Sequence, residues 1–351
     1  MSTKGADIHA PECVLLKMHR HNTALEQDRA MSVYTELTFA ELETFVAQFD
    51  LGALTGFQGV DAGVENTTYF VSLGRCETVL QIFEEQGFDE IPFFIELNRQ
   101  LSDDHVPVAR PLANRDGERL FTLKGKPAAL FSRLKGTTLV DVTRDACRQI
   151  GEALGKMHHH TQDYSHLSRE NHRWSPWWRS NHARVEPFVE EEFKALLADQ
   201  IDRSESFVRQ STTLPNGIIH GDLFIDNALF DGSELTGIID FYNACNGAFV
   251  FDLAVAVNDW CSDASGGLDE RRTRAFISGY QTQRPLTAEE ISVWPDALET
   301  AALRFWMLRL VALARQQEGG PQAPPHVKDP NDFLHILRAR RADPQCELLQ
   351  P

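Results

Sequence analysis

The most informative part of this chain reads Ile218-Ile219-His220-Gly221-Asp222-Leu223-Phe224-Ile225-Asp226-Asn227-Ala228-Leu229-Phe230 and, a few residues later, Leu235-Thr236-Gly237-Ile238-Ile239-Asp240-Phe241. Apolar residues lead into a polar loop, and a hairpin that turns at Asp231-Gly232 returns the chain as a second buried strand. This second strand ends in a carboxylate. The sequence therefore predicts that the side-chain oxygens of Asp222, Asn227 and Asp240 meet at one end of a small sheet.

Oxygen ligands beside a separate carboxylate are typical of metal-assisted phosphoryl transfer. Mg²⁺ prefers hard oxygen ligands and shares its shell with waters and substrate phosphates, so Asn227 and Asp240 are the candidate metal ligands. Asp222 is then free to accept a proton from an attacking hydroxyl and to orient that hydroxyl for in-line transfer. The alternative is a surface turn at Asp222, but it does not explain the second strand and its carboxylate.

The pattern His220-Gly221-Asp222-Leu223-x-x-x-Asn227 with the later Ile239-Asp240-Phe241 resembles the catalytic and metal-binding loops of the protein-kinase-like fold. It resembles the form found in aminoglycoside and choline phosphotransferases, with Gly221 where protein kinases have Arg. Three further segments are similar to the bacterial homoserine kinases of this fold: Gly63-Val64-Glu65-Asn66-Thr67-Thr68-Tyr69-Phe70-Val71, Val257-Asn258-Asp259-Trp260-Cys261 and Ala302-Leu303-Arg304-Phe305-Trp306-x-x-Arg309-Leu310.

The resemblance covers about residues 31–340 and implies both fold and activity. The implied fold is α+β and bilobal, with a β-rich N-lobe that contains one inserted helix and a mainly helical C-lobe. The implied reaction uses ATP and Mg²⁺ to phosphorylate the side-chain hydroxyl of a small molecule, L-homoserine, on the route to threonine. Asp222 is the implied catalytic residue, and His220 is implied to shape its loop.

The lobes can be traced in the sequence around this stretch. Residues 31–133 form the expected N-lobe, 134–345 the C-lobe, 1–30 a flexible N-terminal extension and 346–351 a tail. In the N-lobe, the pattern predicts a helix from Phe39 that ends at Gly52, a polar loop over 61–68, two strands joined at Gly74-Arg75 and a helix from Ile91 to Leu101. Short strands are expected around 106–112, 120–123 and 128–134. A further helix is expected to end at His158-His159-His160, where imidazoles suit the C-terminal helix dipole.

ATP is expected in the cleft near Ala129–Leu134, with Leu134 in its lining. The strand that normally offers a phosphate-binding Lys has Gln81 instead, so the helix-borne Glu96 is expected to lack that partner. An inactive kinase is one reading. The other is that a loop and strand start hold the phosphates through backbone amides and hydroxyls, while Gln81 gives a neutral hydrogen bond. The residues of that segment are Gly63, Asn66, Thr67 and Thr68.

The substrate side needs a cation for the carboxylate of homoserine. Arg304 and Arg309 lie in an apolar helical segment, and either could bind that carboxylate or form a structural ion pair. They point about 140° apart on a helix, so they are not expected to bind the same group. Asp259 is a candidate for the wall of the substrate site. The aromatic group Trp174, Trp177 and Trp178 is expected in the core or in a lid, with a cage for a quaternary ammonium as the alternative.

Composition restricts the remaining possibilities. The 351 residues carry 51 Asp and Glu against 34 Lys and Arg, a net charge of −17, which argues against nucleic-acid binding and an electrostatic membrane role. Irregularly spaced cysteines and the absence of a long apolar run predict a reduced, cytoplasmic protein. The alternatives to a homoserine kinase are a choline-type or aminoglycoside-type phosphotransferase and a non-catalytic nucleotide-binding protein. The sequence does not predict the oligomeric state.

Overall fold

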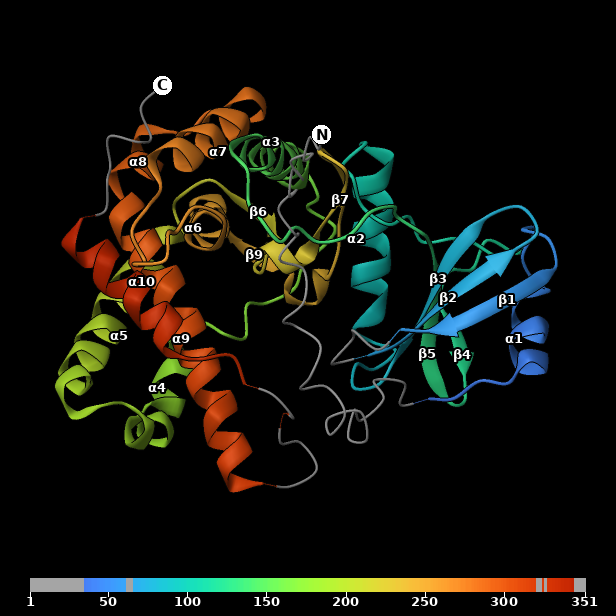
Figure 1. The fold of residues 1–351 in the computed structure, drawn as a ribbon, viewed down its shortest axis with the longest axis horizontal. Coiled ribbons are helices and arrows are strands. Elements are labelled where there is room, and N and C mark those ends of the chain that lie inside the picture. The colour runs from blue at the N-terminus through green and yellow to red at the C-terminus, as the bar shows by residue number, and fades with distance from the viewer. Residues whose placement is uncertain (1–34, 61–65, 320–323, 325–326, 344–351) are drawn as a thin grey trace, which may run out of the picture.

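The computed structural model describes residues 35–60, 66–319, 324 and 327–343. Within this part of the chain a β-sheet lobe and a larger helical lobe lie side by side, as Figure 1 shows. The α+β, bilobal architecture expected from the sequence is therefore confirmed. The predicted extension 1–30 and tail 346–351 fall outside the described residues.

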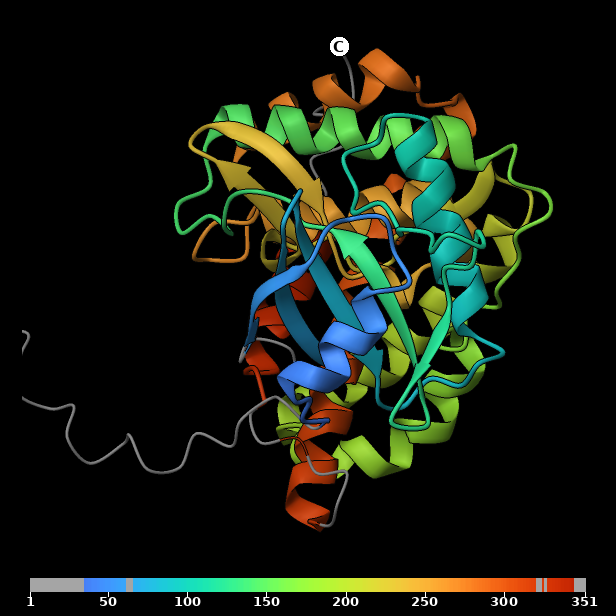
Figure 2. The same ribbon diagram turned by 90° about the vertical axis from the view of Figure 1, so that its right-hand side faces the viewer.

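The N-lobe is built on a five-stranded antiparallel sheet with the strand order β1-β2-β3-β5-β4. Alternating side chains give the sheet two different faces. One face packs on α1 (Phe39–Val46), and the other packs on α2 (Ile91–Asp103), which lies on the C-lobe side of the sheet (Figures 1 and 2). The strands are β1 (Leu54–Gly59), β2 (Asn66–Leu73), β3 (Glu77–Phe83), β4 (Phe121–Leu123) and β5 (Lys126–Ser132).

Several N-lobe elements differ from the sequence predictions. β1 was not predicted, because its two glycines and its polar residues hide the alternation of a strand. Residues 66–68, expected in a loop, already belong to β2. The segment 106–112 forms only isolated bridges, at Val108 and Pro111. α1 ends at Val46, and Gly52, with φ of +94°, lies in the following turn beside Gly74.

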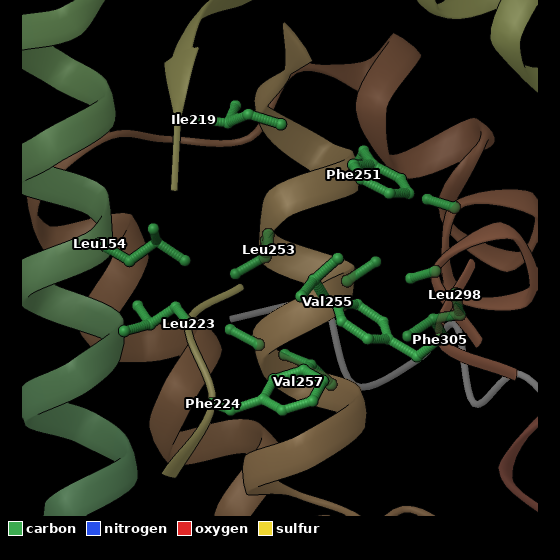
Figure 3. Close-up of a cluster of buried hydrophobic side chains, with 14 of the residues drawn as sticks. Leu154, Ile219, Leu223, Phe224, Phe251, Leu253, Val255, Val257, Leu298 and Phe305 are labelled. Atoms are coloured by element: carbon green, nitrogen blue, oxygen red, sulfur yellow. The ribbon is translucent and has the colours of Figure 1, made fainter. Parts of the chain in front are cut away.

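The C-lobe surrounds one buried helix, α6 (Phe249–Trp260). The side chains of α6 pack against those of α3, α9 and the loop after β6 (Figure 3). Trp174 packs on Phe251 and on Trp178, so this tryptophan pair belongs to the core, as expected. The other C-lobe helices are α3 (Arg144–Thr161), α4 (Ser175–Val185), α5 (Glu191–Ser211), α7 (Glu270–Gln283), α8 (Ala288–Ser292), α9 (Trp294–Glu318) and α10 (Asn331–Ala342).

Two small antiparallel sheets carry the loops of interest. β6 (Asn216–Ile219) pairs with β9 (Cys245–Ala248), and β7 (Ala228–Asp231) pairs with β8 (Glu234–Ile238). The predicted hairpin that turns at Asp231-Gly232 is confirmed. The polar loop between β6 and β7 and the segment after β8 are thereby placed next to each other.

Candidate active site

The loop from His220 to Asn227, called the catalytic loop below, is anchored in the core by its own apolar side chains. Leu223 is fully buried and Phe224 nearly so, and both face α6 and its neighbours in Figure 3. The last two residues of α6 hold its backbone as well. Trp260 donates from Nε1 to the carbonyl of Leu223 at 3.1 Å, and the carboxylate of Asp259 accepts from the N–H of Ile225 at 2.7 Å. The backbone of the catalytic loop is thus fixed between Asp222 and Asn227.

A glycine is required in the second position of this loop. Gly221 has φ of +75°, which other residues adopt only with strain. A Cβ built on Gly221 would also lie 2.9 Å from the carbonyl oxygen of Asn243. The Arg found here in protein kinases therefore has no room in this backbone arrangement.

A fully buried carboxylate on α6 holds the start of the catalytic loop. Asp252 accepts from the backbone N–H groups of His220 at 2.8 Å and Gly221 at 2.7 Å. The side chain of His158 on α3 also contacts this carboxylate, with its Nε2 3.0 Å from Asp252. Burial raises the pKa of Asp252, but these hydrogen bonds outweigh it and hold the pKa below its ordinary value.

The partners of His158 continue away from the site. Its Nδ1 lies 2.9 Å from the Tyr280 hydroxyl. The oxygen of that hydroxyl accepts a hydrogen bond from Arg284 at 2.9 Å. Burial lowers the pKa of His158, so the neutral imidazole donates to Asp252 and accepts from Tyr280. One of the three histidines expected merely to suit the helix dipole is therefore part of a buried polar network.

Asp222 is partly buried and held by its neighbours. Asn243 donates to its Oδ2 at 3.1 Å, and Arg173 donates to the side-chain oxygen of Asn243 at 3.1 Å. Burial, followed by repulsion from Asp240, raises the pKa of Asp222 to about 7. A carboxylate of this kind is suited to exchange protons near neutral pH.

The two predicted metal ligands lie on adjoining segments. The N–H of Ile239 donates to the carbonyl of Asn227 at 3.0 Å, which places Asp240 beside the end of the catalytic loop. The amide nitrogen of Asn227 donates to the carbonyl of Asp222 at 2.8 Å, leaving its oxygen for another partner. Asp240 is exposed and has φ of +65°, a strained conformation typical of functional positions.

His220 links these two segments. Its Nδ1 accepts from the N–H of Asp222 at 3.2 Å, and its Nε2 lies 3.1 Å from the carbonyl of Ile239. The ring therefore ties the catalytic loop to the segment that carries Asp240. This placement agrees with the loop-shaping role that was expected of it.

The predicted nucleotide residues divide between the two faces of the N-lobe sheet. Gln81 is paired with Thr68 on one side and Ala129 on the other, and Ala129 belongs to the face that packs on α2. Thr67 lies on the opposite face, fully buried, and its hydroxyl donates to Glu84 at 2.5 Å. The expectation that the Thr67 hydroxyl binds phosphate is therefore not supported.

The other residues predicted to contact the nucleotide are Asn66, Gly63 and Leu134. Asn66 is buried and accepts from the N–H of Glu84, which directs it away from an exposed site. Gly63 lies outside the described residues. The side chain of Leu134 is packed directly over Gly237 of β8. Glu96, without the usual strand lysine, pairs instead with Arg99 of the same helix, which donates to it at 2.6 Å.

The two candidate substrate arginines have different surroundings. Arg309 donates to Asp332 and to the carbonyl of Asp329, both at 2.6 Å, and stacks on Phe333, so it joins α9 to α10. Arg304 is 1% exposed and lies beside Gly221, with its Nη2 3.6 Å from the position a Cβ would take there. Arg309 therefore forms a structural ion pair, whereas Arg304 is a buried cation close to the catalytic loop.

Comparison with known proteins agrees with this geometry. A profile of the phosphotransferase enzyme family matches residues 56–286. The chain belongs to the phosphotransferase enzyme family. It is 42% identical over 307 residues to a protein of Neisseria meningitidis serogroup B named homoserine kinase, covering 88% of this chain and 99% of that protein. It is 43% identical over 282 residues to a homoserine kinase of Pseudomonas aeruginosa, covering 80% and 89%.

Solved structures show the same fold at low sequence identity. An amicoumacin kinase in complex with AMP-PNP and Ca²⁺ matches with a TM-score of 0.63 and 16% identity, covering 90% of this chain and 95% of that one. A microcompartment-associated aminopropanol kinase matches with a TM-score of 0.61 and 21% identity, covering 87% and 94%. The protein-kinase-like fold is therefore confirmed.

Sequence reasoning missed Asp252, Asn243 and Arg173. Asp252 had a usable signal, because a lone carboxylate in the apolar run of α6 needs buried partners. Arg173 lies in a turn and Asn243 ends a short 3-10 helix, and neither segment has a periodic pattern. Their proximity to Asp222 arises from tertiary structure alone.

Proposed function

We propose that this protein is a homoserine kinase, which transfers the γ-phosphoryl group of ATP to the side-chain hydroxyl of L-homoserine. The observation that carries the proposal is the arrangement of Asp222, Asn227 and Asp240 on two adjoining loops that are tied together by His220. The named relatives, which match over most of their length, support the choice of acceptor. Such an enzyme would act in the cytoplasm on the route to threonine.

Asp222 is the proposed catalytic residue. Its Oδ2 is oriented by Asn243, and it accepts the proton of the homoserine hydroxyl as the oxygen attacks the γ-phosphorus. The new O–P bond forms as the bond to the ADP oxygen breaks, so ADP leaves with its electron pair. Because phosphoryl transfer relies on positioning and charge neutralisation, a fixed Asp222 contributes mainly by orienting the hydroxyl.

Asn227 and Asp240 are the proposed Mg²⁺ ligands, and the donor set fits a hard cation. The oxygen of Asn227 is left free by the bond from its nitrogen to Asp222, and Asp240 is an exposed carboxylate. Among the described residues no group of three or more His, Cys, Asp or Glu side chains could hold a metal, so phosphate oxygens and water would complete the shell. When bound, Mg²⁺ neutralises charge on the phosphates.

For the nucleotide, we propose a site between the inner face of the N-lobe sheet and β8. Thr68 and Gln81 line the sheet side, and Leu134 lies above Gly237 at the other side. Without a lysine, backbone amides and neutral hydrogen bonds from Gln81 would contact the phosphates. This arrangement supports an active kinase over a degenerate one, because the catalytic loop is complete.

One assay compares the proposal with its rivals. ADP release is measured with purified protein, MgATP and each of L-homoserine, choline, methylthioribose and kanamycin. We expect the highest kcat/KM with L-homoserine. Equal or greater turnover with another acceptor would favour a different phosphotransferase, and no acceptor-dependent ADP release with any of them would favour a non-catalytic protein.

A further inference from the structure

A small cavity lies next to the proposed catalytic carboxylate. It has a volume of about 60 Å³ and is lined by the segment 169–173, the loop 242–245 and Arg304 of α9. Asn243 connects the cavity to the reaction centre, because it accepts from Arg173 on one side and donates to Asp222 on the other. A group bound in this cavity would therefore sit within one residue of Asp222.

Arg304 contributes an unpaired buried cation to this cavity. It is 1% exposed, and its Nε and Nη1 have no hydrogen-bond partner among the described residues. Other buried arginines are well paired: Arg284 bonds to Glu290 and Tyr280, and Arg340 bonds to Asn258 and Ser262. The guanidinium of Arg304 lies over the rings of Phe251 and Phe305, at 5.7 and 5.5 Å from their centroids, but these rings do not replace hydrogen-bond acceptors. A buried charge is unfavourable unless a hydrogen-bonded anion compensates it.

A second unpaired donor lies in the same cavity. Asn171 is 8% exposed, its oxygen accepts from the N–H of Arg173, and its Nδ2 is buried without a partner among the described residues. Arg304 and Asn171 come from distant parts of the chain, yet both line one cavity and both carry buried N–H donors without a partner among the described residues. Donors without acceptors on the protein side indicate that the acceptor is a ligand.

We propose that this cavity is the subsite for the carboxylate of the acceptor, with Arg304 and Asn171 donating to its oxygens. This assignment rests on the proposed function. A carboxylate is the right size for so small a cavity, and it supplies acceptors only, as the unpaired donors require. The rest of a homoserine molecule would extend towards Asp222, since its hydroxyl is separated from the carboxyl carbon by three carbons.

The subsite makes Arg304 the residue that determines acceptor class. An alcohol with a carboxylate compensates the buried guanidinium, whereas an alcohol without one leaves Arg304 and Asn171 unpaired. A purely cationic acceptor such as choline would also be repelled by Arg304. The specificity therefore combines an attractive and a repulsive element.

The test compares L-homoserine with 3-aminopropan-1-ol, which is the same molecule without its carboxylate. For the wild type we expect kcat/KM to favour homoserine by at least about 100-fold. In Arg304→Met that preference falls towards unity, through the KM for homoserine, while the KM for ATP is unchanged. Arg309→Met is the matched control, because its guanidinium is already paired with Asp332, and it keeps the wild-type preference.

Thermal unfolding distinguishes a binding role of Arg304 from a purely structural one. If Arg304 only stabilised the fold, its replacement by Met would lower the Tm. Replacing an uncompensated buried cation by Met removes its desolvation cost, so the Tm of Arg304→Met is expected to equal or exceed that of the wild type. Homoserine is expected to raise the Tm of the wild type and not that of the variant. If Arg304→Met fails to fold, Asn171→Leu decides, with a smaller loss of the same preference.

The acceptor preferences of the wild type and the variants test the carboxylate subsite and the kinase activity separately. A wild type that favours homoserine, with variants that keep this preference, overturns the carboxylate subsite and leaves the kinase proposal standing. A wild type that uses both acceptors equally also overturns the subsite, because the carboxylate then contributes nothing, whereas a wild type that uses neither overturns the proposed function itself. Loss of the preference in Arg304→Met or Asn171→Leu, with Arg309→Met unaffected, supports the subsite.

Discussion

The substitution Asp222→Asn should stabilise the metal-free protein, and more so as the pH rises. In the folded state burial raises the pKa of Asp222 from 3.8 to about 7. Between these values the native state binds more protons than the unfolded state, so the stability of the wild type falls as the pH increases. The asparagine variant does not titrate and is spared this loss.

The magnitude follows from the size of the shift. About three pKa units at about 1.36 kcal/mol each give a loss of roughly 4 kcal/mol once the pH exceeds 7. Of this, about 2.5 kcal/mol falls between pH 5 and pH 8. For a lobe of this size the Tm advantage of Asp222→Asn should therefore grow by roughly 5–10 °C over that interval.

The assay is thermal unfolding by calorimetry in EDTA at several pH values, with wild type and variant measured together. Asp226→Asn is the matched control, because Asp226 is an exposed carboxylate of the same loop and pairs with Lys328 at the surface. It should show no comparable pH-dependent gain. A Tm difference between Asp222→Asn and wild type that stays constant from pH 5 to pH 8 would show that the pKa of Asp222 is not raised by folding.

Three further predictions concern the supports of the loop and the metal. Gly221→Ala should cost about 1–3 kcal/mol of unfolding free energy and lower kcat, since its Cβ would strain the backbone and press on Asn243; an unchanged Tm and kcat would contradict this. Asp252→Asn should lower stability by about 3 kcal/mol in urea unfolding, because one of the two buried acceptor oxygens becomes an NH2 donor that faces a backbone N–H; an unchanged stability would argue that Asp252 does not anchor the catalytic loop. Chelation of divalent cations should abolish ADP release reversibly, and Asp240→Asn should raise the Mg²⁺ concentration needed for half-maximal rate; activity that persists in EDTA would exclude the Asn227 and Asp240 metal site.

Local patterns in the sequence were enough to predict the hairpin and the lobes. The run from Ile218 to Phe230 passes from apolar to polar and back to apolar residues. This pattern predicts a buried strand, a polar loop and a second buried strand. The helix beginning at Ile91 was equally clear, because Pro92 suits a first turn. β1 was hidden, because its burial comes from the pairing with β2 and not from its own composition.

The site could be predicted only where its residues are close in sequence. Asp222, Asn227 and Asp240 flank one hairpin, so the pairing of its two strands brings them together. The two arginines of α9 looked equivalent in the sequence, and only the tertiary contacts distinguish them. Arg309 meets Asp332 from α10, whereas Arg304 faces a cavity whose other walls come from residues 169–173 and 242–245.

Thr67 illustrates a different limit. Its hydroxyl and that of Thr68 seemed equally suited to phosphate, but neighbouring residues of a strand point to opposite faces. Once residues 66–68 belong to β2, one hydroxyl is buried against Glu84 and the other lies on the α2 side. The error therefore came from assigning a loop where the chain already forms a strand.

We propose that the loop carrying Asp222 transfers a phosphoryl group to L-homoserine. The most direct test is to follow the reaction by ³¹P NMR with MgATP and L-homoserine, for the wild type and for folded Asp222→Asn. The wild type should form one phosphate monoester of homoserine for each ADP, and the variant should work at less than about one-hundredth of that rate. No phosphorylated homoserine from the wild type would exclude L-homoserine as the acceptor, and an unchanged rate in Asp222→Asn would exclude Asp222 as the catalytic residue.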